Sequence, residues 1–128
     1  MPGYASVYAQ LSTTITQDIV KSGKPYLPAN VWLNVNFPAS TSSSCASASN
    51  FKFVLSRINT AVPIVSGADV VTCGNGGRLP TETTVVDTAG CYVSISVGDA
   101  DTKLTASAAQ QATVLSKLGS LLTCLPTS

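Results

Sequence analysis

Residues 24–38, KPYLPANVWLNVNFP, decide the fold of this chain. Apolar residues alternate here with one tryptophan and two amides: Val31, Leu33, Val35 and Phe37 on one side, Trp32, Asn34 and Asn36 on the other. A period of two is typical of a β-strand, so one face would be apolar and the other mixed. Pro28 and Pro38 bound the pattern, and we expect a central strand whose apolar face is covered by a helix.

Two segments have the three-to-four residue spacing of an amphipathic helix. The first covers residues 4–22, with Gly23 and Pro25 at its end and apolar positions at Tyr4, Val7, Tyr8, Leu11, Ile15 and Ile19. The second begins at a cap formed by Thr105 or Ser107 and continues to about Leu122. Its apolar face is predicted at Ala108, Ala112, Leu115 and Leu122 beside Gly119, widened by Val114, Leu118, Leu121 and Leu125. Such a wide face implies burial against a sheet and leaves room for a partner subunit, so a homodimer is possible.

Three further segments are rich in strand-forming residues. Residues 51–58, FKFVLSRI, form one strand, and residues 83–87 and 91–97 are separated by three residues, short enough for a hairpin. Residues 38–50 and 59–72 are predicted as loops, the second ending in a short extended piece at 69–72. Residues 73–83, CGNGGRLPTET, are a glycine-rich turn whose backbone could approach a ligand closely. We therefore predict a single α/β domain over residues 1–128, a helix/sheet/helix (αβα) sandwich with a mixed sheet of about four or five strands between the amino- and carboxyl-terminal helices.

Charge and composition narrow the classes of partner. The net charge is +1 and 10% of residues are charged, so the chain lacks the basic field that nucleic acids or anionic lipids require. No apolar run approaches the roughly 20 residues that span a bilayer, so membrane insertion is not expected. Residues 1–20 also lack the basic start and continuous apolar run of a signal peptide, so export would use a signal already removed or another route.

The cysteines are interpreted as two disulfides. Cys45, Cys73, Cys91 and Cys124 form no close pair and the chain has no histidine, which makes a zinc site the weaker alternative. A seven-residue strand from Cys91 advances about 23 Å and a helix of about 17 residues returns about 26 Å, which brings Cys124 back near Cys91. We therefore expect Cys91–Cys124 and Cys45–Cys73, and with them a secreted, extracellular protein.

Four stretches together resemble a known family: YLPANVWLNVNFP, CGNGGRLPTETTVV, GCYVSISVGDADTK and QQATVLSKLGSLLTCLP. In order, they look like the carboxyl-terminal half of fungal SurE-family proteins, which are phosphatases or 5'/3'-nucleotidases. The family holds a metal ion mainly through an Asp-Asp-Gly motif in its amino-terminal half. This sequence contains no Asp-Asp pair, so none of the family's metal or catalytic residues can be carried over. A domain of this size and type also resembles small mushroom glycan-binding proteins, which are lectins with a helix/sheet/helix sandwich.

Candidate ligand-binding residues flank the predicted strands: Asn75, Arg78, Glu82, Asp99 and Asp101, with the aromatic residues Trp32 and Tyr92. The amide, guanidinium and carboxylate groups can bind vicinal hydroxyls, and the aromatic rings can stack on a sugar. Each also has a structural interpretation: a turn for the glycine-rich loop, helix capping for Asp99 and Asp101, and packing beneath a helix for Trp32. Asn34 and Asn36 are either satisfied by neighbouring loops or line a polar cleft.

The resemblance to mushroom glycan-binding proteins, more than any motif, implies a secreted, non-catalytic lectin that binds N-acetylhexosamine-containing glycans or glycoproteins and needs no cofactor. Without histidine, a serine or cysteine nucleophile lacks its usual base, which argues against a hydrolase of that type. Two alternatives remain open. One is the carboxyl-terminal part of a SurE-like phosphatase, and the other is a structural dimerisation unit of a larger protein.

Overall fold

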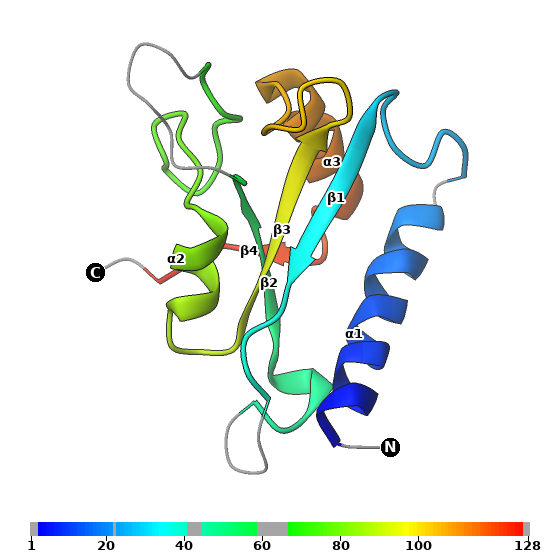
Figure 1. The fold of residues 1–128 in the computed structure, drawn as a ribbon, viewed down its shortest axis with the longest axis vertical. Helices are drawn as coiled ribbons and strands as arrows, with labels where there is room; N and C mark the ends of the chain where they lie inside the picture. Colours follow the sequence, from blue (N-terminus) through cyan, green and yellow to red (C-terminus); the bar gives the residue numbers. More distant parts are fainter. Residues whose placement is uncertain (1–2, 22, 41–44, 59–66, 127–128) are drawn as a thin grey trace.

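The structure, a computed structural model, describes residues 3–21, 23–40, 45–58 and 67–126 (Figure 1). Its elements in chain order are α1 Gly3–Val20, β1 Val31–Asn36, the 3-10 turn η1 Ala48–Asn50, β2 Lys52–Ser56, α2 Glu82–Asp87, β3 Tyr92–Asp99, α3 Ala108–Leu118 and β4 Leu122–Thr123. The predicted α/β class with a mixed sheet is confirmed. Ser22, the Tyr4 side chain, residues 41–44 of the first predicted loop and residues 59–66 of the second lie outside this description.

The described strands form a four-stranded sheet in the order β1-β3-β2-β4. β1 is antiparallel to β3, while β2 runs parallel to both β3 and β4. The strand predicted from residues 31–37 is confirmed, but its central position is wrong, because β1 lies at one edge of this sheet and β3 lies inside it. β3 suits the inner position since Val93, Ile95 and Val97 fill one face while Ser94 and Ser96 leave room on the other.

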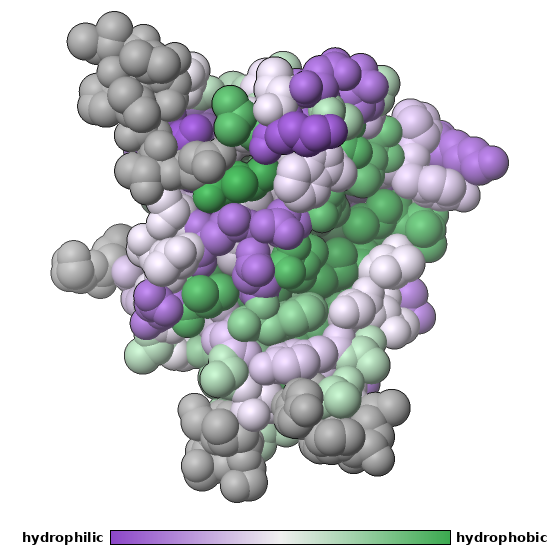
Figure 2. Space-filling view, in the orientation of Figure 1, coloured by the Kyte–Doolittle hydropathy of each residue, from purple (hydrophilic) through white to green (hydrophobic). Residues whose placement is uncertain are grey.

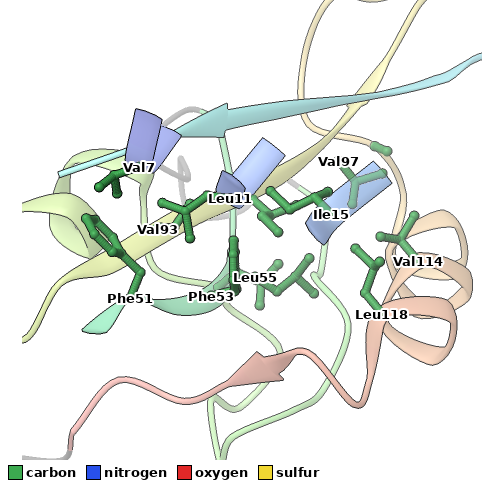
Figure 3. Packing of buried hydrophobic residues seen from close by; sticks show 13 residues of the cluster. Val7, Leu11, Ile15, Phe51, Phe53, Leu55, Val93, Val97, Val114 and Leu118 are labelled. Carbon is green, nitrogen blue, oxygen red and sulfur yellow. The ribbon is translucent and has the colours of Figure 1, made fainter. Parts of the chain in front are cut away.

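The odd-numbered face of the sheet carries the main hydrophobic core. Figure 3 shows Val7, Leu11 and Ile15 of α1 gathered with side chains of β2, β3 and α3. Both long helices therefore cover the same face, and α2 lies on the other side of the sheet (Figure 1). The three layers are as predicted, but the helix on the second face is α2 rather than a terminal helix. The reason is that β1, β2 and β3 place most of their apolar residues on one face, which leaves only Val54 and Tyr92 to pack against Val85 of α2 on the other.

Residues 83–87 form a helix, so the strand and the hairpin predicted there are wrong. Thr81 caps α2 by accepting a hydrogen bond from the Thr84 backbone N–H at 3.3 Å, and Glu82 follows in the first turn, where the helix dipole favours a negative charge. This local cap outweighs the strand propensity of the Thr and Val residues. Residues 69–72, predicted to be extended, pair with no strand among the described residues.

α3 begins as predicted, and its buried side chains match the predicted apolar face only in part. Ser107 forms a capping box with Gln110. The fully buried row is Gln111, Val114 and Leu118, whereas Ala112 of the predicted row is exposed. Gln111 can be buried because its amide binds both the Asp69 carboxylate and the Val70 backbone N–H. The predicted face contains Val114 and Leu118 but omits Gln111, because an apolar pattern does not count a polar side chain.

Two disulfides are present, with pairings different from those predicted. Cys45 is joined to Cys91 and Cys73 to Cys124, with Cα–Cα distances of 5.6 and 5.7 Å. The length argument failed because the chain after α3 forms β4, which pairs with β2 and not with β3. β4 carries Cys124 to the outer edge of β2, where it meets the glycine-rich loop. Among the described helices, none has the length and apolarity needed to cross a membrane.

Candidate functional site

The even-numbered face of β1 and β3 holds the most polar row of the described sheet. Trp32, Asn34 and Asn36 of β1 pair in register with Gly98, Ser96 and Ser94 of β3, respectively. Alternate residues of a strand lie on one face about 7 Å apart, so these side chains form a line along the sheet. In Figure 2, hydrophilic side chains gather in the middle of this view, between α2 and β1, with hydrophobic residues beside them.

Glu82 connects α2 to this row. Its Oε2 atom accepts hydrogen bonds from Nδ2 of Asn34 and, at 2.8 Å, from Nδ2 of Asn36. One carboxylate oxygen therefore orients both amides. Among the described residues, Glu82 Oε1 and the amide oxygens of Asn34 and Asn36 have no hydrogen-bond partner. The described residues place buried unpartnered side-chain atoms only on Asp18 and Arg57, so these three acceptors reach solvent.

Trp32 lies at one end of the row with 36% of its surface exposed. Its indole packs directly over Gly98, where an added Cβ would lie 2.3 Å from the ring. Glycine at this position thus allows the ring to approach β3 closely. The helix expected over Trp32 is absent among the described elements, and the ring keeps a solvent-facing surface suitable for stacking.

Buried hydroxyls support the row from the interior. Ser56 Oγ lies 2.6 Å from Ser94 Oγ and 2.7 Å from Ser96 Oγ, and all three side chains are fully buried. The three hydroxyls hydrogen-bond to one another and link β2 to β3 at the centre of the sheet. Because they are buried, they are not accessible to a ligand. The accessible polar groups are those of Asn34, Asn36 and Glu82.

The other candidates at the sheet face have structural roles. Tyr92 is buried against Val54 and Val85, with Lys52 Nζ 5.5 Å from its ring centre. Asp99 Oδ1 accepts from the backbone N–H groups of Asp101 and Thr102 within a turn. The helix-capping role expected of it is wrong, because the next helix, α3, begins at Ala108 and is capped by Ser107. Asp101 is exposed in the same turn. This turn is joined to the start of β1 by the Ala100 N–H, which donates to the Asn30 carbonyl at 2.8 Å.

Asn75 and Arg78 lie on the glycine-rich loop at the β2–β4 side of the sheet, away from Trp32 at the β1 edge. Asn75 holds the loop together, because Oδ1 accepts from the Gly77 N–H at 2.8 Å and Nδ2 donates to the Val70 carbonyl at 2.9 Å. Arg78 donates to the Gly67 carbonyl and lies 3.6 Å from Asp69 Oδ2. The seven predicted residues are therefore not one site. Trp32 and Glu82 belong together. Asn34 and Asn36, for which the sequence left open satisfaction by loops or a place in a polar cleft, complete their cluster.

The described residues do not offer a ligand set for the metal ion that the SurE resemblance implies. Across the described residues, no group of three or more acidic, cysteine or histidine side chains could hold a metal ion. The four cysteines are all in disulfides, which removes their thiolates as ligands.

No family model matches the chain, and neither the curated proteins nor the solved structures give a match.

Proposed function

We propose that this chain is a secreted, non-catalytic carbohydrate-binding protein whose site is formed by Trp32, Asn34, Asn36 and Glu82. One observation carries the proposal: Glu82 Oε2 accepts from both amides and so fixes three polar groups beside an exposed indole. Preorganised groups bind more tightly because less conformational freedom is lost on binding. The two disulfides fit an oxidising, extracellular environment.

The open atoms of the cluster indicate the chemistry of the ligand. Glu82 Oε1 and the amide oxygens of Asn34 and Asn36 are hydrogen-bond acceptors, so they select a ligand with several donors. Sugar hydroxyls and the N–H of an acetamido group are such donors. Trp32 adds an apolar surface for the face of a pyranose ring. An N-acetylhexosamine-containing glycan supplies all of these groups together.

Glycan-array binding tests the proposal, with Trp32→Ala and Glu82→Gln as site variants. Tyr26→Ala is the matched control, because Tyr26 is an exposed aromatic residue outside the cluster. We expect the parent and Tyr26→Ala to bind N-acetylhexosamine glycans alike. Loss of a charge-assisted hydrogen bond in Glu82→Gln should weaken binding about ten- to a hundred-fold. Absence of binding by the parent, or unchanged binding by both site variants, would refute this site.

The SurE resemblance provides the enzymatic alternative, which the same preparation can test. We expect no hydrolysis of p-nitrophenyl phosphate or nucleoside monophosphates with Mg²⁺ or Mn²⁺ present. Metal-dependent turnover that copurifies with the chain through several columns would favour the phosphatase. A dimer measured by light scattering, without glycan binding or turnover, would favour the structural alternative.

A further inference from the structure

A second site lies on the opposite side of β2 from the Trp32 cluster. Three segments enclose a cavity of about 430 Å³ there: the glycine-rich loop, the end of α3, and the chain from β4 onward. β4 has only two residues, and beyond it the outer edge of β2 pairs with the end of the glycine-rich loop through the Arg57–Thr81 bridge, so the cavity lies between these two short contacts. The Cys73–Cys124 disulfide, whose two cysteines line the cavity, ties two of the segments together.

The walls of the cavity are mainly aliphatic. Leu79, Leu115, Leu122 and Leu125 come from these three segments and line the same space. Ligand cavities usually measure about 300 to 1,000 Å³ and combine apolar walls with a few polar groups, so this one is large enough for a small amphipathic molecule. Of the polar residues that line it, Asn75 is already occupied in holding its own loop.

The charge at the cavity comes from Arg78. Its Nη1 atom donates to the Gly67 carbonyl at 2.8 Å, and its side chain remains 39% exposed. Asp69 cannot neutralise it fully, because Asp69 Oδ2 lies 3.6 Å from both Arg57 Nη1 and Arg78 Nη1. Two guanidinium groups share one carboxylate, which leaves an excess positive charge. Among the described residues, Nε and Nη2 of Arg78 have no hydrogen-bond partner, and they lie in the planar arrangement that suits a carboxylate.

We infer that this cavity binds an amphipathic carboxylate, a medium-chain fatty acid, with the alkyl chain among the leucines and the carboxylate at Arg78. Apolar walls alone would accept any aliphatic molecule. The excess positive charge at one lining residue selects the anion. This site shares no residue with the Trp32 cluster, so its occupation is independent of glycan binding.

Calorimetric titration with decanoate and with decanol, both below the concentrations at which they aggregate, tests the inference. We expect decanoate to bind about tenfold more tightly than decanol, the ratio expected for one partly exposed charge-assisted contact. In the series octanoate, decanoate and dodecanoate, each methylene that the cavity buries should raise affinity about fourfold. Equal affinities for decanoate and decanol would overturn the inference, as would no binding of either.

Two variants localise the binding. Arg78→Gln should lower decanoate affinity about tenfold and leave decanol affinity unchanged. The control Lys24→Gln removes a charge that does not line the cavity and should change neither affinity.

Thr123→Trp fills the cavity from an exposed lining position and should abolish binding of both ligands, whereas Thr16→Trp on α1 should not. Melting curves confirm that each variant is folded. Full decanoate binding by folded Thr123→Trp would overturn the site. Trp32→Ala should bind decanoate like the parent, which separates this test from that of the glycan site.

Discussion

The two faces of the sheet are packed differently: one is covered by apolar side chains, and the other is held by hydrogen bonds between polar side chains. On one face, Val93, Ile95 and Val97 of β3 are covered by α1 and α3 in a continuous apolar core. On the other, Ser94 and Ser96 of the same strand hydrogen-bond to Ser56, and Glu82 binds two amides of β1. Apolar packing is non-directional, but each polar contact requires a particular partner. The first face should therefore dominate stability, while the second should tolerate few changes in chemistry and carries the proposed glycan site.

The largest expected effect is on the apolar face. Ile95 has no exposed surface, so Ile95→Ala should lower the free energy of unfolding by about 2 to 5 kcal/mol through lost burial and a cavity. Urea titration followed by circular dichroism measures it. The control is Ile95→Val, which should cost about 0.5 to 1.5 kcal/mol. If Ile95→Ala lowers the free energy of unfolding by less than Ile95→Val does, this face is not the dominant core.

The next effect tests the connection between α2 and β1. Glu82→Ala removes the shared acceptor of Asn34 and Asn36, and we expect a loss of about 1 to 3 kcal/mol because two half-buried amides lose their partner. Asp87→Ala removes an exposed acid from the same helix and is the matched control, expected within about 0.5 kcal/mol of the parent. If the two variants unfold at the same urea concentration, the Glu82 contacts do not contribute to stability.

A smaller effect is expected at the buried hydroxyls. Ser56→Ala leaves Ser94 and Ser96 without their common partner, at a cost of about 1 to 2 kcal/mol. Ser116→Ala, at an exposed position of α3, serves as the control. A Ser56→Ala protein as stable as the parent would indicate that the hydroxyl group is replaceable by apolar packing, and the contrast between the faces would be weaker than described.

The smallest change in stability, about 1 kcal/mol, is expected for Gly98→Ala, because the exposed Trp32 ring can swing away from the new methyl group. Trp32 is the single tryptophan of the chain, so intrinsic fluorescence reports its position alone. We expect the emission maximum to move to longer wavelength as the ring becomes more solvated. Emission identical to that of the parent would show that the ring does not depend on the glycine.

The sequence alone was sufficient for elements with a long, regular pattern. The alternation from Val31 to Asn36, the helical spacing of Val7, Leu11 and Ile15, and the cap at Ser107 each predicted an observed element, because local periodicity determined it. Of the candidate site, Trp32 and Glu82 were identified from their chemistry, and the two amides were recognised as unusual.

The errors arose where a short cap or a contact between distant parts of the chain decides the outcome. Residues 83–87 have strand propensity, but the Thr81 cap and burial of Val85 against Val54 and Tyr92 favour a helix. The two-residue β4 is too short to produce a pattern, yet its pairing with β2 determines where Cys124 lies and hence both disulfides. The link between Glu82 and Asn34 spans 48 positions, a contact that no local spacing encodes.

The strand order has a consequence for how the chain folds as it is synthesised. β1 and β2 are not neighbours, and both pair with β3, so neither strand can form its β3 pairing in the described sheet until β3 has been synthesised. Because synthesis adds about 5 to 20 residues per second, β1 and β2 remain without this partner for seconds. In an oxidising compartment Cys45 and Cys73 are both present during this wait, and joining them closes a shorter loop than either native bond, which costs less entropy. Maturation should therefore pass through a Cys45–Cys73 species and depend on thiol–disulfide exchange to reach the native pairs.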